Sequence, residues 1–186
     1  MTRIIAGEFR GRRLGVPAES TRPTSDRVRE AVFSMLGARA DLDGLRVLDL
    51  YAGTGALGIE AVSRGAASAV LVEADRRAAR VVRDNVAICR AGNRVRVVDR
   101  TVESFLTAGA GPFDLVFIDP PYDLSSDDVA AILALVLPAL TDGAWVVVER
   151  GSRSVAVDLP DGLEAVADKK YGDSRVQLAH RVDSPS

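Results

Sequence analysis

The chain has 186 residues, of which 47% are hydrophobic and 27% charged, and its formal net charge is −2. These values fit one globular domain and exclude a disordered chain. No apolar run of about eighteen residues and no signal-peptide core is present, so the sequence predicts a cytoplasmic protein without a membrane partner. The single Cys89 excludes an intramolecular disulfide, and the lone His180 has no ligand cluster beside it, so we expect no metal.

Positive charge is concentrated in the first forty residues, where eight arginines stand against four acidic residues. This part carries a charge of +4 and the remainder −6, which permits local binding of a polyanion. Two short extended segments around a turn rich in Gly and Arg predict an N-terminal β-hairpin over residues 1–20.

Phe9 lies among the arginines of this predicted hairpin. Arginines beside an aromatic residue suit phosphate contact and base stacking, most readily with a non-duplex RNA loop. A solvated charged face without a ligand is the alternative reading. The residues expected to contact RNA are Arg3, Phe9, Arg10, Arg12, Arg13 and Arg22.

A helix is predicted to start near Asp26, which favours a first turn, with Thr24 or Ser25 as its cap. Apolar residues then recur at helical spacing and form one stripe that packs on a sheet, with Arg27 and Arg29 directed elsewhere. The members of this stripe are Val28, Ala31, Val32, Met35 and Leu36.

A strand, a glycine-rich turn and the start of a helix are predicted over residues 47–62. Gly53, Gly55 and Gly58 match the dinucleotide-binding pattern, which is a weak signal by itself. Asp49, four residues before Gly53, would put negative charge where a dinucleotide fold receives pyrophosphate. S-adenosylmethionine has no phosphate and carries an ammonium and a sulfonium, so the pattern favours this cofactor.

Two further strand ends supply candidate cofactor contacts. A strand over residues 69–72 ends at Glu73, whose carboxylate can accept hydrogen bonds from both ribose hydroxyls. After a helix over residues 76–90, a strand over residues 95–98 leads to Asp99-Arg100-Thr101-Val102. Residues at the end of this third strand are expected to contact the adenine of the cofactor.

The apolar run from Phe113 to Ile118 predicts a buried parallel strand that ends at Asp119-Pro120-Pro121-Tyr122. Two consecutive prolines must stop the strand, and they fix the directions of the carbonyl groups. A carboxylate, a proline carbonyl and a tyrosine ring at a strand end can hold a planar amine, such as a nucleobase amino group. The alternative is an ordinary strand-to-helix loop, in which Asp119 satisfies a helix N-terminus and Tyr122 covers a core edge.

The remaining elements predict a doubly wound α/β sheet. A helix follows Ser125, a fifth strand covers residues 145–148, and residues 164–170 and 175–180 form a closing antiparallel hairpin. Residues 183–186 are expected to be a disordered tail.

Three segments together resemble the RsmD-type methyltransferases. They are the N-terminal ribbon with Arg22-Pro23-Thr24, the loop from Asp49 to Gly55, and Asp119-Pro120-Pro121-Tyr122. These bacterial enzymes use S-adenosylmethionine to methylate the exocyclic N2 of one guanine in 16S rRNA. The resemblance covers nearly the whole chain. It implies a Rossmann-like class I methyltransferase fold over residues 21–182, with a seven-stranded sheet whose last strand is antiparallel.

The resemblance also implies roles for individual residues. Catalytic roles are implied for Asp119, Pro120, Pro121 and Tyr122. Contacts to S-adenosylmethionine are implied for Thr24, Asp49, Tyr51, Gly53, Gly55, Glu73, Thr101, Val102 and Asp119. Thr101 stands where the family usually has an acidic residue, so whether Asp99, Thr101 or Val102 meets the adenine stays open.

The implied partner is 16S rRNA within an assembled or nearly assembled 30S subunit, bound by a monomer. Three alternatives remain open. An adenine-N6 methyltransferase of DNA or RNA would use the same core. A nicotinamide-dependent oxidoreductase would explain the glycines but not Asp49 or the Asp-Pro-Pro-Tyr segment. A non-catalytic RNA-binding protein could use a methyltransferase-like fold.

Overall fold

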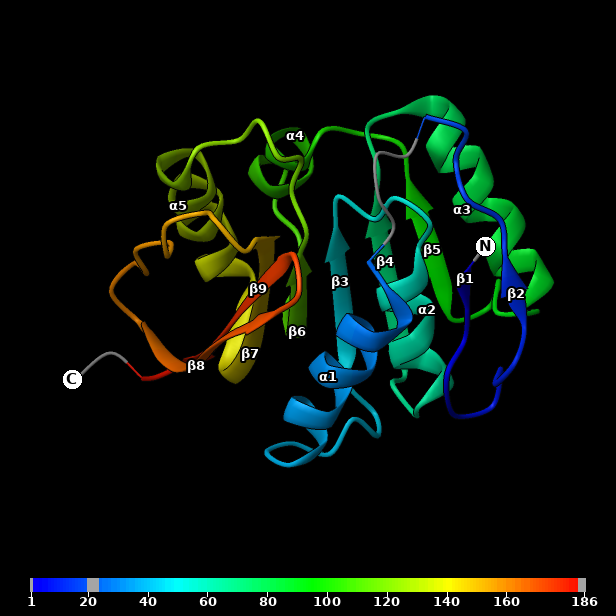
Figure 1. Ribbon diagram of the computed structural model, residues 1–186, viewed down its shortest axis with the longest axis horizontal. Helices are drawn as coiled ribbons and strands as arrows, with labels where there is room; N and C mark the ends of the chain where they lie inside the picture. The colour runs from blue at the N-terminus through cyan, green and yellow to red at the C-terminus, as the bar shows by residue number, and fades with distance from the viewer. Residues whose placement is uncertain (1, 20–23, 184–186) are drawn as a thin grey trace.

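The computed structural model describes residues 2–19 and 24–183, and its centre is a seven-stranded sheet (Figure 1). The strand order is β5-β4-β3-β6-β7-β9-β8. The strands are β3 (Arg46–Leu50), β4 (Ser68–Val72), β5 (Val95–Val98), β6 (Phe113–Ile118), β7 (Leu140–Gly151), β8 (Leu163–Tyr171) and β9 (Ser174–Arg181). The first five are parallel, and β9 runs antiparallel to both of its neighbours. The predicted sheet with an antiparallel last strand is confirmed.

Helices cover both faces of the sheet (Figure 1). One core layer contains α1 (Asp26–Gly37), α2 (Ala56–Ser63) and α3 (Arg76–Ile88), and the other contains α4 (Val102–Thr107) and α5 (Ser126–Val136). A short 3₁₀ helix (Leu137–Ala139) leads from α5 into β7.

Side chains of β6 alternate between these two core layers. Leu115 and Phe117 pack with α1, α2 and α3, whereas Val116 and Ile118 pack with α4 and α5. All four are fully buried or nearly so, which explains the continuous apolar run in the sequence.

Strand β7 is longer than the predicted strand of residues 145–148. Its register against β6 shifts between Phe113 and Leu115, before Trp145 pairs with Leu115. The early part contains Thr141, Asp142 and Gly143, which lack an apolar pattern, so periodicity alone did not include it.

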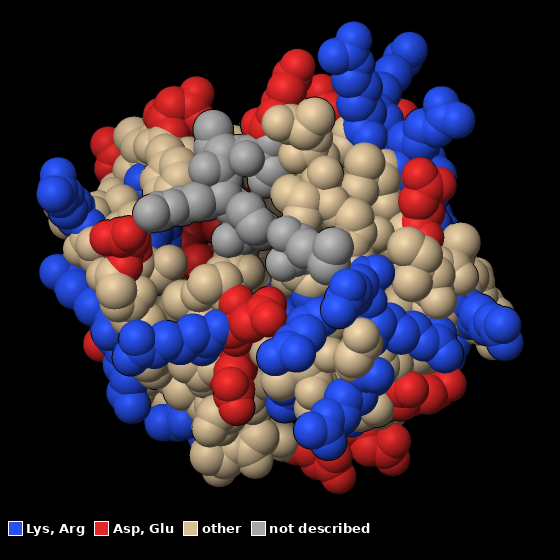
Figure 2. Space-filling model, turned by 45° about the vertical axis from the view of Figure 1, so that its right-hand side comes forward, with Lys and Arg blue, Asp and Glu red and all other residues tan. Residues whose placement is uncertain are grey.

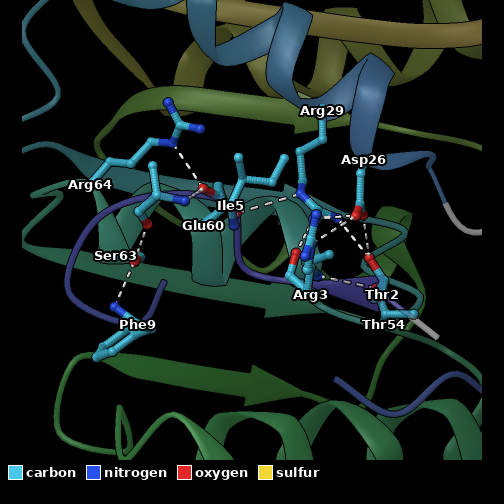
Figure 3. Close-up of polar contacts among 12 residues, drawn as sticks. Thr2, Arg3, Ile5, Phe9, Asp26, Arg29, Thr54, Glu60, Ser63 and Arg64 are labelled. Carbon is cyan, nitrogen blue, oxygen red and sulfur yellow. Dashed lines mark hydrogen bonds and ion pairs between the residues drawn. The ribbon is translucent and has the colours of Figure 1, made fainter. Parts of the chain in front are cut away.

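The predicted N-terminal hairpin is confirmed as a ribbon of β1 (Thr2–Arg3) and β2 (Arg13–Leu14), which pair antiparallel. Polar side chains of α2 hold it (Figure 3). Glu60 accepts hydrogen bonds of 2.9 and 3.0 Å from the backbone N–H groups of Ile5 and Ala6. Ser63 Oγ accepts a hydrogen bond of 2.9 Å from Phe9 N–H. These hydrogen bonds therefore attach the ribbon to α2 of the domain that contains the sheet.

The prediction that Arg29 points away from the core is wrong, because its side chain is fully buried. Its guanidinium donates to Thr2 Oγ1 at 2.9 Å and to the carbonyl of Arg3 (Figure 3). It also lies 3.1 Å from Asp26 Oδ1 and 3.5 Å from Glu60 Oε2. Two carboxylates and the ribbon thus compensate the charge that Arg29 brings into the interior.

The predicted disordered tail falls mainly on residues 184–186, outside the described residues. Within residues 2–19 and 24–183, no helix combines the length and apolar character needed to cross a membrane.

Candidate active site

The loop after β3 brings the backbone close to β4 and α3. Tyr51 (φ 59°) and Gly55 (φ 78°) adopt left-handed conformations, and Gly55 precedes the first residue of α2. A Cβ on Gly55 would lie 2.8 Å from Leu71 Cδ2 and 3.0 Å from Val82 Cγ1. The predicted glycine-rich turn is confirmed, and Gly55 is needed there for both conformation and space.

Glu73 follows β4 and is directed to the glycine-rich loop. Its Oε2 accepts a hydrogen bond of 2.9 Å from Gly53 N–H, and its Oε1 accepts one of 3.0 Å from Asp75 N–H. Parallel pairing of β3 with β4 brings these two strand ends to one edge. Each carboxylate oxygen keeps capacity for a further donor, so Glu73 can still accept hydroxyl hydrogens.

The Asp119-Pro120-Pro121-Tyr122 loop follows β6 at the same edge. Asp119 is half-buried and Pro120 buried, whereas Tyr122 is 64% exposed. The Tyr122 ring lies over Gly151, where a Cβ would be 3.4 Å from the ring atom Cε1. The loop therefore presents an acidic group at depth and an aromatic face at the surface.

Glu149 is a site residue that the sequence did not predict. It is 8% exposed near the end of β7, and its Oε1 accepts a hydrogen bond of 2.9 Å from the Ser174 hydroxyl. Thr24 Oγ1 lies 3.0 Å from Glu149 Oε2 and 2.9 Å from Asp119 Oδ2. Burial and the charge of Glu149 raise the pKa of Asp119, while the hydrogen bond with Thr24 opposes this rise.

These groups border one cavity of about 880 Å³. Its size is in the range of pockets that hold cofactors and small molecules. Its lining combines the loop after β3, the end of β4, the Asp-Pro-Pro-Tyr loop, the start of α1 and the β8–β9 turn. Predicted site residues in this lining are Thr24, Tyr51, Gly53, Glu73, Asp119, Pro120, Pro121 and Tyr122.

Asp49 lies beneath the loop and is not part of this lining. Its Oδ2 accepts a hydrogen bond of 2.9 Å from Gly58 N–H, and a Cβ on Gly58 would lie 3.2 Å from this oxygen. Burial raises the pKa of Asp49 to about 8, against the opposing effect of the Gly58 hydrogen bond. A direct contact between Asp49 and a cofactor stays a prediction.

Replacement of Asp49 by asparagine should change how stability depends on pH. The ordinary pKa of this carboxyl is 3.8 and the folded-state value is about 8, so the folded protein holds the proton more tightly. The stabilising contribution of the protonated Asp49 carboxyl is complete below about pH 4 and is lost as pH rises through about 8. We expect the free energy of unfolding of the wild type to fall more between these values than that of Asp49→Asn. Urea unfolding across this range checks this, and parallel curves would contradict it.

Comparison with known proteins decides the family. The model of the family described as Conserved hypothetical protein 95 matches residues 2–180. Ribosomal RNA small subunit methyltransferase D of Escherichia coli (strain K12) is 43% identical over 144 residues, which are 77% of this chain and 68% of that protein. The chain belongs to the RsmD-type methyltransferases.

Two further proteins match this RsmD-type methyltransferase over most of both chains. The protein of the same name from Haemophilus influenzae is 34% identical over 151 residues, 79% of this chain and 77% of that protein. The solved structure of the yhhF protein from Escherichia coli superimposes with a TM-score of 0.85 at 35% identity, and the match covers 97% of both chains. The fold is therefore shared over nearly the full length.

The third strand end of this RsmD-type chain holds predicted cofactor residues that lie outside the cavity lining. Thr101 is exposed and caps α4 through a 3.2 Å hydrogen bond from Ser104 N–H, and Val102 is buried in the core. Asp99 is exposed and also outside the lining. Contact of one of these three residues with an adenine stays a prediction.

The prediction that Phe9 stacks on an RNA base is wrong for this fold. Phe9 is 1% exposed, and the guanidinium carbons of Arg12 and Arg94 lie 5.2 and 5.3 Å from its ring centroid. The ring belongs to the same core layer as α1 and α2, so no base can reach it. Arg22 lies outside the described residues, and Arg3 is exposed beside Asp26 at 3.6 Å.

An RsmD-type chain that binds rRNA needs a basic surface. Here α3 and the ribbon lie side by side and together carry exposed arginines. Asn85 of α3 accepts a 2.7 Å hydrogen bond from Gly15 N–H and donates one of 2.9 Å to the Gly15 carbonyl. Figure 2 shows basic side chains, with some acidic ones among them, on the side of the molecule formed by α3 and the ribbon. The exposed arginines that we call the basic face are Arg10, Arg13, Arg76, Arg80, Arg83 and Arg90.

Proposed function

We propose that this chain transfers a methyl group from S-adenosylmethionine to the exocyclic N2 of a guanine in 16S rRNA. The observation that carries the proposal is one cavity bordered by the glycine-rich loop, by Glu73 and by the Asp119–Tyr122 loop. The relatives named ribosomal RNA small subunit methyltransferase D support the same substrate class.

The charges around the cavity suit this cofactor. Among residues 2–19 and 24–183, Arg27 and Arg77 line it against six acidic residues, which favours a ligand that carries positive charge. The acidic residues are Glu19, Glu73, Asp75, Asp119, Glu149 and Asp173. S-adenosylmethionine supplies an electrophilic methyl group on a sulfonium. Glu73 would hold its ribose hydroxyls, beside the backbone of Tyr51 and Gly53.

The Asp-Pro-Pro-Tyr loop suits an aromatic amine, which is a poor nucleophile because its lone pair is delocalised into the ring. Hydrogen bonds from its two N–H groups to the Asp119 carboxylate and the Pro120 carbonyl favour a pyramidal nitrogen with a free lone pair. The exposed Tyr122 ring can stack on a base that has left its helix. Positioning and fixed electrostatics then supply the acceleration, and Asp119 accepts the released proton.

The direct test is transfer of labelled methyl to unmethylated 30S particles, to naked 16S RNA and to DNA, each then digested to nucleosides. We expect label in N2-methylguanosine from 16S RNA. Label confined to methyladenine from DNA would agree with methylation of an aromatic amine but would contradict guanine in 16S rRNA as the substrate. No transfer to any of the three would return the chain to the non-catalytic alternative.

The partner is proposed to be the assembled or nearly assembled 30S subunit, bound by a monomer. The basic face lies on the side of the molecule formed by α3 and the ribbon (Figure 2), which suits docking on an RNA loop that a particle already holds in place. A ribosomal substrate also favours a cytoplasmic location. The ratio of transfer to particles and to naked RNA in the same experiment tests the form of the substrate.

The basic face should control RNA affinity. We expect Arg80→Ala with Arg83→Ala on α3, and separately Arg10→Ala with Arg13→Ala on the ribbon, to weaken RNA binding. Each pair should also reduce the slope of log K against log salt, by about 0.7 for each phosphate of single-stranded RNA that the variant no longer neutralises.

Filter binding or fluorescence anisotropy across a salt series measures this slope. The control removes the same charge with Arg39→Ala, past the far end of α1, and Lys169→Ala, on β8 at the other edge of the sheet. Equal loss of affinity in the control pair would show that only net charge matters.

A further inference from the structure

Glu149 is a buried carboxylate in the cavity to which the mechanism above gives no role. Ile118 of β6 pairs with Val148 of β7. Asp119 and Glu149 are the residues that follow this pair, so both lie at the same edge of the sheet. Parallel strands therefore bring two acidic side chains to one point, a placement that costs free energy unless protons or donors compensate it.

A single hydroxyl lies between these two carboxyl groups. Thr24 Oγ1 is 2.9 Å from Asp119 Oδ2 and 3.0 Å from Glu149 Oε2, and both distances are those of hydrogen bonds. A threonine hydroxyl has one hydrogen to donate, so it can donate to only one of the two. The second contact requires a proton on a carboxyl group, which then donates to the threonine oxygen.

The other oxygen of Glu149 is also fixed. Its Oε1 accepts a hydrogen bond of 2.9 Å from the Ser174 hydroxyl at the start of β9. Glu149 is thus held between two hydroxyls from distant parts of the chain, and only the Thr24 side leads to Asp119.

We propose that Asp119, Thr24 and Glu149 form one proton-sharing unit, in which Glu149 acts through Thr24 to prepare Asp119 for the proton that the amine loses. This inference rests on the proposed function. Glu149 is a positioning residue in this unit, because Asp119 is the group that touches the amine.

The step balances in atoms and charge. The lone pair of N2 forms the new N–C bond, and the pair of the S–C bond stays on sulfur, which becomes a neutral thioether. The positive charge is then on N2, whose proton moves to the ionised carboxylate of Asp119. At rest the unit holds one proton, and it loses this proton to water before the reaction, so that both carboxylates are ionised. It then gains the proton of the amine, shares it through Thr24, and releases it to water after the neutral methylated base leaves.

Charges around the unit set the sign of its response to pH. Burial and Glu149 raise the pKa of Asp119, Thr24 opposes this, and Asp49 from β3 adds to the rise. Burial also raises the pKa of Glu149, against the hydrogen bonds with Ser174 and Thr24. Other charged or titratable groups line the same cavity from neighbouring elements. Among the described residues they are Glu19, Arg27, Tyr51, Glu73, Asp75, Arg77, Tyr122, Tyr171 and Asp173.

The test is the pH dependence of the single-turnover methylation rate at saturating cofactor and RNA. Glu149→Gln keeps the shape and removes the charge, so it should move the acid limb of the profile to lower pH. The plateau rate should fall about tenfold, because Asp119 becomes a weaker base. Thr24→Val removes the opposing hydrogen bond and should move the limb to higher pH, and Thr24→Ser should restore the wild-type position.

Opposite shifts in Glu149→Gln and Thr24→Val, each measured at concentrations of cofactor and RNA that saturate that variant, would support the unit. A purely structural role would lower the rate at every pH and leave the limb in place, and this result would overturn the proposal. The shift can be measured on whichever amine the wild type methylates. Failure of the guanine assignment would appear separately, as a different labelled nucleoside.

Discussion

Asp119→Ala is expected to lower the rate of methyl transfer by about 10³-fold, the scale of losing a general base and a fixed electrostatic contact. Asp119 is the only acidic residue within the Asp-Pro-Pro-Tyr loop, and we propose its carboxylate as the acceptor for one N–H of the amine. Affinity for S-adenosylmethionine should change little, because Glu73 and the glycine-rich loop remain. Single-turnover rates and calorimetric titration of the cofactor measure the two effects separately.

The same experiment decides between two roles that the resemblance implies for Asp119, catalysis and cofactor contact. Equal losses of rate and of cofactor affinity would count against the catalytic role. Asp123→Ala is a matched control, since Asp123 is exposed just after Tyr122 and does not line the cavity. This control should keep both the rate and the affinity.

Glu60→Ala is expected to lower the free energy of unfolding by about 3–5 kcal/mol. Glu60 is fully buried, and its removal leaves Arg29 without one of its two carboxylate partners. It also removes the acceptors of the Ile5 and Ala6 N–H groups, so the ribbon loses its attachment to α2. Urea unfolding measures the loss.

Glu30→Ala provides the comparison for this second prediction. Glu30 is exposed on α1, and loss of an exposed charge normally changes stability by less than about 0.5 kcal/mol. If Glu60→Ala cost no more than this control, the buried network would not hold the ribbon. RNA affinity of the Glu60 variant should also fall, because Arg10 and Arg13 lie on the ribbon.

Much of the site could be predicted because it follows one simple pattern. Glu73 and Asp119 each come directly after an apolar strand, and parallel strands place such residues at one edge. Glu149 follows the apolar residues of β7 in the same way, so the signal for it was present in the sequence. Its role depends on Thr24 and Ser174, which are distant in sequence and could not be paired with it in advance.

The two wrong predictions have a common physical cause, since both assume that charged or arginine-flanked residues face solvent. Arg29 lies three and four residues before Val32 and Phe33, so it shares their buried helical face. Its partner Glu60 lies on another helix, and sequence periodicity cannot show such a pair. Phe9 is enclosed because Arg12 and Arg94 cover its ring. The prediction instead had the ring exposed for base stacking, with arginines around it contacting phosphate.

The position of β9 has a consequence for how the chain matures. β9 is the last strand in the sequence, yet it lies inside the sheet between β7 and β8. During synthesis β7 and β8 leave the ribosome before the strand that separates them, so β7 keeps an open edge until Ser174–Arg181 emerges. Ser174 also belongs to this strand. A nascent chain therefore completes the part of the cavity lining that contains Ser174 last, and one that stops before β9 exposes an edge that can pair with other chains.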